Sequence, residues 1–310
     1  MYELIMKKFS DFYFDIQGEL KENYPLASLT WFKVGGPAQL LFIPENKDDL
    51  IKFIKTCPIK YPKTIIGAGS NLLIRDGGVP GIVISMKKIN SVQPNNQNLY
   101  AECGALDMTI SREASKAGIS GLEFLIGIPG TIGGGIKMNA GSYGSEIKDI
   151  LKDVEVIDYS GSVFKINSEE LKMEYRKSNT PDDWLFLSCN LKGEKSDCQK
   201  IRSRMKEIMN DRKNNQPINE LTGGSTFKNP YKMKSWELID AAGCRGLTFG
   251  NAKVSEKHCN FLINNGKANS SDIEQLGNII KNKVLFQSGI NLEWEIIRIG
   301  KQIENENDNA

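Results

Sequence analysis

The sequence predicts an α+β protein built from three successive units. Its 310 residues exceed the usual length of a single domain. Short apolar runs typical of strands alternate with segments of helical periodicity, without an internal repeat. The formal net charge is only +2 and the chain has a single histidine, His258. We therefore expect neither binding to nucleic acid or a membrane nor a metal site.

The first unit is predicted over residues 26–90, after an N-terminal arm of residues 1–25. In its helix, Leu50, Ile51 and Ile54 recur at the spacing of one apolar helix face. The strands are apolar runs separated by glycines. The expected elements are strands over 31–34 and 37–44 around a Gly-Gly turn, a helix over 47–56, and strands over 63–66, 72–74 and 79–86.

The second unit is predicted over residues 91–195. Its helix begins with Asp107 as the N-cap residue, and Gly118 follows its end. A Ser-Gly turn at 160–161 separates two alternating runs and indicates a hairpin. The expected elements are a strand over 98–104, a helix over 107–117, a hairpin over 153–166 and a strand over 184–193.

The third unit is predicted over residues 196–300, followed by a polar tail, 301–310, that we expect to be disordered. Ser271 and Glu274 have the spacing of a capping box at the start of a long helix. The expected elements are a basic amphipathic helix over 196–214, a helix over 236–243, a strand over 261–266, a helix from Ser271 and a final strand over 291–300.

The cysteines and the N-terminus indicate a compartment. The six cysteines contain no CxxC pair, so we expect free thiols in a reducing environment and no structural zinc. The first residues lack the apolar core of a signal peptide, and no segment has the length of a membrane span. We therefore expect a cytoplasmic protein.

The first motif that indicates a ligand is Gly67-Ala68-Gly69-Ser70-Asn71, directly after an expected strand. Glycines let backbone N–H groups converge on phosphate oxygens, and the Ser and Asn side chains can donate as well. The motif is neither a Rossmann fingerprint nor a P-loop, because Leu72 stands at the position of the third glycine and no GK[ST] follows. A simple glycine turn stays an equally good interpretation of this segment alone.

The second motif is denser in glycine. Nine of the 29 glycines lie between residues 118 and 144. Each would cost a regular helix or strand about 0.5–1 kcal/mol, so turns alone do not explain their concentration. A ligand with both a diphosphate and a planar ring would need such close approach of bare backbone.

These two motifs belong to a longer ordered set. The segments TWFKVGGPA, YRKS, GSTFKNP, VSEKH and LEWEIIRIG follow in sequence, beginning at residues 30, 175, 224, 254 and 292. Together with the glycine motifs, they closely resemble the UDP-N-acetylenolpyruvoylglucosamine reductase family, also called UDP-N-acetylmuramate dehydrogenases. The resemblance runs from about residue 30 to residue 300.

The resemblance implies a fold and cofactors. It implies noncovalent FAD bound by a two-lobed domain of the vanillyl-alcohol-oxidase (PCMH) type, with lobes at about 26–90 and 91–195. A C-terminal α+β domain, 196–300, would bind the UDP-sugar substrate, and NADPH would be the reductant. The residues that the resemblance places at the flavin are Gly67, Ala68, Gly69, Ser70, Asn71, Ile128, Pro129, Gly130, Gly133, Gly134, Asn139 and Gly141.

The resemblance also assigns catalytic roles. Hydride addition to an enol ether conjugated with a carboxylate leaves a carbanion that needs electrostatic stabilisation and a proton. Ser225 corresponds to the proton donor, and Arg176 and Glu295 to the groups that stabilise the carboxylate and enolate. Without the resemblance, a turn serine, a surface ion pair and an edge-strand charge would explain the three residues equally well. Expected substrate-binding residues are Tyr175, Lys213, Lys228 and Asn229.

Two alternatives and one departure accompany this interpretation. A flavin-dependent alcohol or lactone oxidase of the same fold would often tether its flavin through a histidine, which the expected FAD domain lacks. A nucleotide-sugar binding protein without catalysis would not need Arg176, Ser225 and Glu295 together. The chain lacks the extra loop that supplies a tyrosine in one branch, so it resembles the shorter branch. We expect no obligate protein partner, and a hydrogen-bonded structural role for His258.

Overall fold

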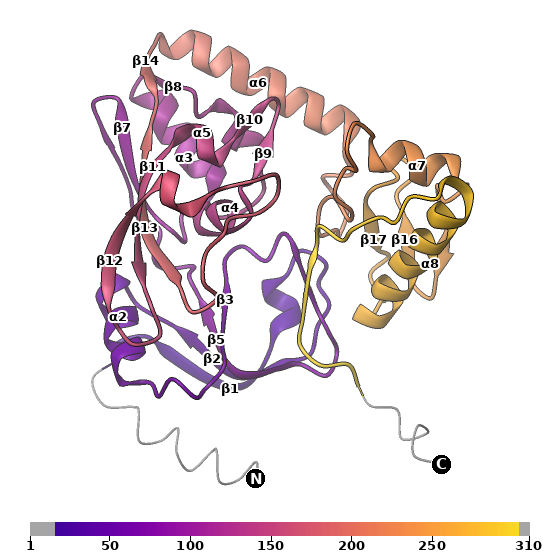
Figure 1. The fold of residues 1–310 in the computed structure, drawn as a ribbon, viewed down its shortest axis with the longest axis horizontal. Coiled ribbons are helices and arrows are strands. Elements are labelled where there is room, and N and C mark those ends of the chain that lie inside the picture. Colours follow the sequence, from indigo (N-terminus) through magenta and orange to yellow (C-terminus); the bar gives the residue numbers. More distant parts are fainter. Residues whose placement is uncertain (1–15, 304–310) are drawn as a thin grey trace. The chain divides into compact units, whose positions relative to one another are not determined.

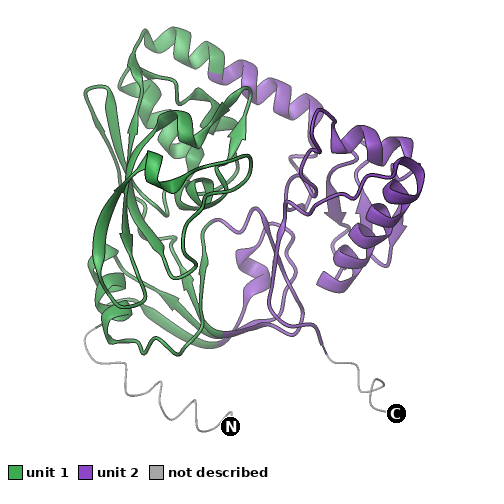
Figure 2. Cartoon of the chain, viewed as in Figure 1, with its two compact units in different colours: residues 1–22, 40–67, 81–204 green, residues 23–39, 68–80, 205–310 purple. Residues whose placement is uncertain are grey.

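A computed structural model describes residues 16–303, which divide into two compact units (Figure 2). Unit 1 contains residues up to 22, 40–67 and 81–204, and unit 2 contains 23–39, 68–80 and 205 onward. The predicted lobe and domain boundaries remain predictions. Most of the expected arm, 1–15, and of the expected tail, 304–310, lies outside the described residues. The last part of that arm is ordered, because Glu19–Pro25 forms strand β1.

The first sheet has the strand order β1-β2-β5-β3, with β3 and β5 parallel. No strand forms over residues 31–34, directly before the Gly-Gly pair, contrary to the prediction. Instead, Thr30 Oγ1 lies 3.2 Å from the Ala27 carbonyl and 3.1 Å from that of Val34, and so closes a tight loop. The elements are β1 (Glu19–Pro25), the 3-10 helix η2 (Leu26–Leu29), β2 (Pro37–Ile43), α2 (Lys47–Thr56), β3 (Lys63–Ile66) and β5 (Val79–Ser85).

The second sheet is antiparallel and lies within unit 1, with the strand order β12-β11-β13-β7-β6. The predicted hairpin forms, with Ile157 opposite Val163 at its turn end. Helices α3, α4 and α5 lie on one side of this sheet (Figure 1). The strands are β6 (Val92–Asn95), β7 (Asn98–Glu102), β11 (Leu151–Ile157), β12 (Val163–Asn167) and β13 (Leu185–Lys192).

One continuous apolar core fills unit 1, and in it the rings of Phe42 and Phe53 stack 4.2 Å apart. Helix α3 borders this core, and its N-cap lies one residue earlier than predicted. Leu106 is the N-cap residue and Asp107 the first helical residue, whose side chain makes no capping hydrogen bond. The remaining elements of unit 1 are α3 (Asp107–Lys116), β8 (Ile119–Ser120), η3 (Glu123–Gly127), α4 (Ile132–Met138), β9 (Gly141–Ser142), β10 (Ser145–Glu146), α5 (Ile147–Ile150), η4 (Ser168–Leu171) and β14 (Glu194–Lys195).

Unit 2 has its own apolar core, with a three-stranded sheet of order β15-β16-β17 and a parallel pair of β18 with β4. The predicted capping box is wrong. Asn269 is the N-cap residue of α8 and forms the box with Asp272, while Glu274 has other partners. The elements are β4 (Leu72–Ile74), α6 (Cys198–Asn215, which begins in unit 1), α7 (Ser235–Ala241), β15 (Thr248–Phe249), β16 (Ala252–Val254), β17 (Leu262–Asn264), α8 (Ser270–Ser288) and β18 (Ile297–Ile299).

All six cysteines are free thiols, and five of them are buried. Among residues 16–303, no helix combines the length and the apolar character that crossing a bilayer requires.

Candidate active site

The loop from Gly67 to Asn71 joins β3 to β4, and its glycines permit close packing. A Cβ atom at Gly67 would lie 2.2 Å from Thr131 Oγ1, and one at Gly69 would lie 2.1 Å from the Leu29 carbonyl oxygen. Gly69 also has a φ of +64°, which favours glycine. The contact with Thr131 places the start of this loop against the second glycine-rich segment, within unit 1.

The same loop presents backbone donors. Within residues 16–303, the amides of Ala68, Gly69 and Ser70 donate to no protein acceptor. Consecutive N–H groups of this kind form a concave site that suits an anion such as a phosphate group. These donors are compatible with the ligand-binding interpretation of this motif, which stays a prediction.

The second glycine-rich segment combines tight packing with open space. Gly133 packs against Cys103, the residue that follows β7. Its amide donates to the Cys103 carbonyl, and an added Cβ would lie 2.8 Å from that oxygen. At Gly134 an added Cβ would meet only Thr131 Oγ1, at 3.6 Å. A side chain at Gly134 would fill this space, so the segment offers bare backbone to a ligand. The open space at Gly134 fits the close approach of a ligand such as FAD.

Thr131 is a residue that the sequence reasoning missed. Its side chain lies between Gly67 and Gly134, and its backbone pairs with Leu106. Gly130, which precedes it, accepts a hydrogen bond from the Asp107 amide. Thr131 lies within the second glycine motif, and this position was the signal that could have drawn attention to it. Its contact with the first motif joins residues far apart in the sequence, so local patterns could not predict it.

Asn139 and Gly141, both predicted at the flavin, form part of a network that holds Arg176. Asn139 ends helix α4 in a left-handed conformation and is fully buried. Its Nδ2 donates to Glu146 Oε2 at 2.9 Å and to the Glu174 carbonyl at 3.0 Å, while its Oδ1 accepts from the Lys148 amide. This side chain therefore anchors the turn that carries Arg176, a role the sequence did not indicate.

Arg176 lies at the tip of that turn, where Glu174 and Lys177 exchange backbone hydrogen bonds. Its φ of +56° is uncommon for a residue with a side chain. The guanidinium donates to the Gly141 carbonyl at 3.0 Å and lies 5.0 Å from the centre of the Tyr175 ring. Partial burial acts to raise the pKa of Glu146, but hydrogen bonds from Lys148 and Asn139 and the charge of Arg176 bring this pKa below its usual value.

Ser225 and Glu295 lie on adjacent segments of unit 2. The Glu295 amide donates to the Thr226 carbonyl at 2.8 Å, and Phe227 pairs with Trp294 in antiparallel fashion. Both Ser225 and Glu295 are half-buried. The structure thus brings the predicted proton donor and the predicted catalytic glutamate to neighbouring positions.

Asn71, predicted at the flavin, contacts the segment of Glu295. Its Nδ2 donates to the Glu295 carbonyl at 3.1 Å, and its own carbonyl accepts from the Ile297 amide at 3.0 Å. The glycine loop and the Glu295 segment are therefore tied together within unit 2. Because 224 residues separate Asn71 from Glu295, sequence spacing gave no signal of this contact.

The predicted substrate-binding residues have diverse surroundings. Tyr175 is exposed, and Lys213 is exposed in the last turn of α6. Lys228 Nζ lies 3.4 Å from Glu293 Oε2. Asn229 Oδ1 accepts from the amide of Ser235 and so supports the start of α7. Asn229 thus has a structural contact beside any role toward substrate.

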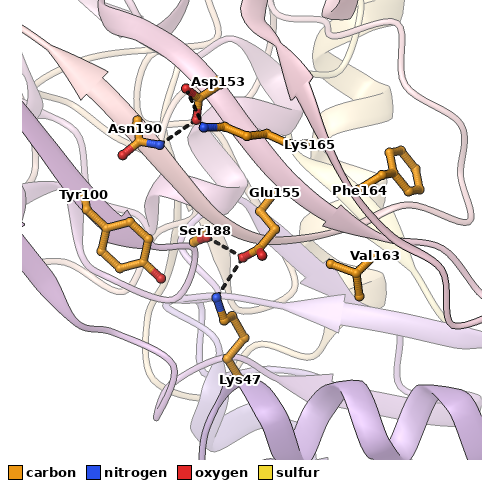
Figure 3. Close-up of a pocket in the computed structure, with 9 residues that line it drawn as sticks. All are labelled: Lys47, Tyr100, Asp153, Glu155, Val163, Phe164, Lys165, Ser188 and Asn190. Carbon is orange, nitrogen blue, oxygen red and sulfur yellow. Dashed lines mark hydrogen bonds and ion pairs between the residues drawn. The ribbon is translucent and has the colours of Figure 1, made fainter.

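A pocket of about 390 Å³ in unit 1 contains none of the predicted site residues (Figure 3). Lys47 Nζ lies 2.8 Å from Glu155 Oε2, and Lys165 Nζ lies 3.0 Å from Asp153 Oδ2. The charges of this pocket are thus paired with one another. Its lining residues are Lys47, Tyr100, Asp153, Glu155, Val163, Phe164, Lys165, Ser188 and Asn190.

Comparisons with known proteins support the flavin interpretation. The family model "FAD binding domain" matches residues 38–167, and the model "UDP-N-acetylenolpyruvoylglucosamine reductase, C-terminal domain" matches residues 216–299. The chain is 49% identical to the UDP-N-acetylenolpyruvoylglucosamine reductase of Paramagnetospirillum magneticum, over 92% of this chain and 93% of that one. It is 47% identical to that of Rickettsia rickettsii, over 92% and 97%.

A solved structure agrees. The UDP-N-acetylenolpyruvylglucosamine reductase of Thermus caldophilus superposes with a TM-score of 0.80 at 33% identity, covering 92% of this chain and 100% of that one. These matches confirm the predicted fold class, an FAD-binding domain of the vanillyl-alcohol-oxidase type followed by a C-terminal α+β domain. The chain therefore belongs to the UDP-N-acetylenolpyruvoylglucosamine reductase family and is an FAD-dependent oxidoreductase.

Proposed function

We propose that the protein reduces UDP-N-acetyl-3-O-(1-carboxyvinyl)glucosamine to UDP-N-acetylmuramate, a peptidoglycan precursor, with NADPH as the reductant. The observation that carries this proposal is an identity of 46–49% over more than nine-tenths of the chain to reductases with this substrate in their name. The local surroundings of the predicted site residues are compatible with it.

Bound FAD would supply hydride chemistry, accepting a hydride from NADPH and passing one to the substrate. The protein's own task is then to stabilise negative charge next to the substrate carboxylate and to protonate the adjacent carbon. We assign the proton to Ser225. Within residues 16–303, its hydroxyl group makes no hydrogen bond, so this side chain has no structural contact that would oppose donation.

Arg176 and Glu295 are assigned to the developing charge. The guanidinium of Arg176 is planar and suits two-point binding of a carboxylate. Glu295 would act in its acid form, as a hydrogen-bond donor to the enolate oxygen. Tyr175, Lys213, Lys228 and Asn229 are proposed to bind the remaining parts of the substrate, with the lysines directed to its diphosphate.

The function is tested on the purified holoprotein. We expect a yellow protein that releases FAD on denaturation and is bleached by NADPH without oxygen. Addition of the enolpyruvyl UDP-sugar should then restore the absorbance of oxidised flavin. A colourless protein that does not take up FAD, or a reduced protein that this UDP-sugar does not reoxidise, would overturn the proposal.

The proton assignment is tested with Ser225→Ala in the same assay. Reduction by NADPH should stay fast, while reoxidation by substrate should slow by roughly 10²- to 10⁴-fold, the usual contribution of a general acid. Ser288→Ala, which removes a hydroxyl group at the end of α8, serves as the control and should leave both steps unchanged. Equal slowing of both steps in Ser225→Ala would show that Ser225 is structural.

A further inference from the structure

Asn260 binds the backbone directly after Ser225. Its Nδ2 donates to the Phe227 carbonyl at 2.8 Å, and its Oδ1 accepts from the Phe227 amide at 2.9 Å. Its main-chain carbonyl accepts from the Thr226 amide at 2.7 Å. One buried residue thus makes three hydrogen bonds to the backbone of two consecutive residues, as a neighbouring strand would. All of these residues lie within unit 2.

These bonds determine where Ser225 lies. On its N-terminal side, Gly223 packs on the Phe32 ring, and Gly224 has a φ of +82°, which favours glycine. Ser225 itself pairs with Phe261, the residue after Asn260. The segment of Asn260 and Phe261 therefore holds the backbone at Ser225 and directly after it. Because Phe227 is buried, loss of the Asn260 side chain would leave its N–H and C=O groups unpaired away from water.

Asn260 is itself held by the segment that contains the only histidine. Its amide donates to His258 Nδ1 at 3.3 Å, and the His258 amide donates to Ser255 Oγ at 3.2 Å. Burial lowers the pKa of His258, which favours the neutral ring that can accept this bond. The His258 ring also packs edge-on against Phe261, with centroids 4.9 Å apart. The histidine thus helps to hold Asn260 in place, in line with its expected structural role.

We propose that Asn260 is a positioning residue for Ser225. Its carboxamide fixes the N–H and C=O groups of Phe227, and its main-chain carbonyl fixes the Thr226 amide. Together these bonds set the direction of the Ser225 hydroxyl group toward the carbon that is protonated. Asn260 does not act on the substrate itself. This inference rests on the proposed function, because it concerns the proton-transfer step of that reaction.

The test uses Asn260→Asp in the full-length holoprotein. This substitution keeps the shape and the acceptor for the Phe227 amide, but it places an oxygen opposite the Phe227 carbonyl in place of the donor. Reduction of the flavin by NADPH should keep its wild-type rate. Reoxidation by the UDP-sugar should slow by about 100-fold, as expected for a displaced reacting group. The solvent deuterium isotope effect on reoxidation should increase, because proton transfer becomes rate-limiting.

Asn264→Asp is the matched control. Asn264 is equally buried, at 5% exposure against 4% for Asn260, and its side chain also makes several hydrogen bonds to backbone. Its Nδ2 donates to the Phe32 carbonyl at 2.7 Å, and its Oδ1 accepts from the amides of Gly266 and Ala268. We expect a similar shift in the urea midpoint for both variants, but a slow reoxidation only for Asn260→Asp.

Two further results decide the inference. In a Ser225→Ala background, Asn260→Asp should cause little additional slowing, since the residue through which it acts is gone. Should Asn260→Asp yield no folded holoprotein, Asn260→Ser removes the same side-chain bonds without adding a charge and is judged by the same criteria. Reoxidation at the wild-type rate, or equal slowing in Asn264→Asp, would overturn the role of Asn260. A wild-type protein that the UDP-sugar does not reoxidise would instead contradict the proposed function.

Discussion

Two buried carboxyl groups, one in each unit, have opposite surroundings. In unit 2, Glu274 accepts hydrogen bonds from Arg75 Nε at 3.0 Å and Nη2 at 2.9 Å, and from Arg298 Nη1 at 2.8 Å. In unit 1, Asp107 is fully buried, and neither of its oxygens has a hydrogen-bond partner among the described residues. The hydrogen bond from Arg75 lowers the pKa of Glu274 although burial opposes it, whereas burial raises the pKa of Asp107 to about 8. Partners, more than depth, decide whether a buried carboxyl group is charged.

The difference matters for the candidate active site. Arg298, which Glu274 binds, follows Glu295 by three residues and lies 4.6 Å from the centre of the Trp294 ring. The charged Glu274 therefore anchors the segment that carries Glu295. Asp107, in contrast, donates its amide to Gly130, within the segment expected to meet the flavin diphosphate. A neutral carboxyl group adds no negative charge beside that anion.

The largest effect is expected from Asp107→Asn. Between pH 4 and pH 8 the unfolded chain ionises Asp107 while the folded protein keeps it protonated, so this group lowers stability as pH rises. An asparagine removes this dependence. The variant should match the wild type near pH 4 and exceed its free energy of unfolding by about 4 kcal/mol at pH 7. Urea unfolding at several pH values measures the difference, and the flavin content should be unchanged.

Asp49→Asn is the control for this prediction, since Asp49 is buried but accepts hydrogen bonds from the amides of Gln17, Gly18 and Glu45. Here the substitution should destabilise the protein, because an NH₂ group replaces one of two oxygens that accept from backbone amides. A stability difference between Asp107→Asn and wild type that does not vary with pH would contradict the assignment of a neutral Asp107.

Both carboxyl groups also mark where sequence reasoning reaches its limit. The sequence predicted the helices that contain them, because apolar periodicity is a local property. It placed Asp107 at an N-cap and Glu274 in a capping box, because those positions have the right residue types at the right spacing. The actual N-cap of α8 is Asn269, and the main partner of Glu274, Arg75, lies 199 residues earlier. Local patterns do not encode such partners.

In the candidate site, too, some features were predictable from local patterns and others were not. The glycine motifs and the family resemblance carried the predictions of the flavin loops and of Ser225, Arg176 and Glu295. The groups that hold these residues were not predictable. Asn139, Asn71 and Asn260 use ordinary side-chain amides, and their significance arises only from the backbone groups that the fold places beside them.

A smaller effect is expected from Glu274→Gln. The substitution keeps the volume but leaves the guanidinium groups of Arg75 and Arg298 without their carboxylate, and breaking such a buried pair costs about 3 kcal/mol. The contribution of Glu274 is present above its usual pKa and is lost as pH falls through the lowered folded value. The loss should therefore be constant from pH 6 to pH 8 in urea unfolding. A loss of stability that grows between pH 6 and pH 8 would contradict the charged state of Glu274 in the folded protein.

The smallest effect is expected from Asp240→Asn. This variant tests whether the geometry of an arginine–carboxylate pair or its burial determines how much the pair stabilises the fold. Asp240 and Arg245 form a two-point pair, at 2.8 Å and 2.6 Å, similar to that of Glu274 with Arg75. The hydrogen bond from Arg245 likewise lowers the pKa of Asp240. Both side chains are more than a third exposed, however, so water and salt screen the pair. We expect a loss below about 1 kcal/mol that decreases further in high salt. A loss equal to that of Glu274→Gln would mean that pairing geometry alone, independent of burial, sets the stability that such carboxyl groups contribute.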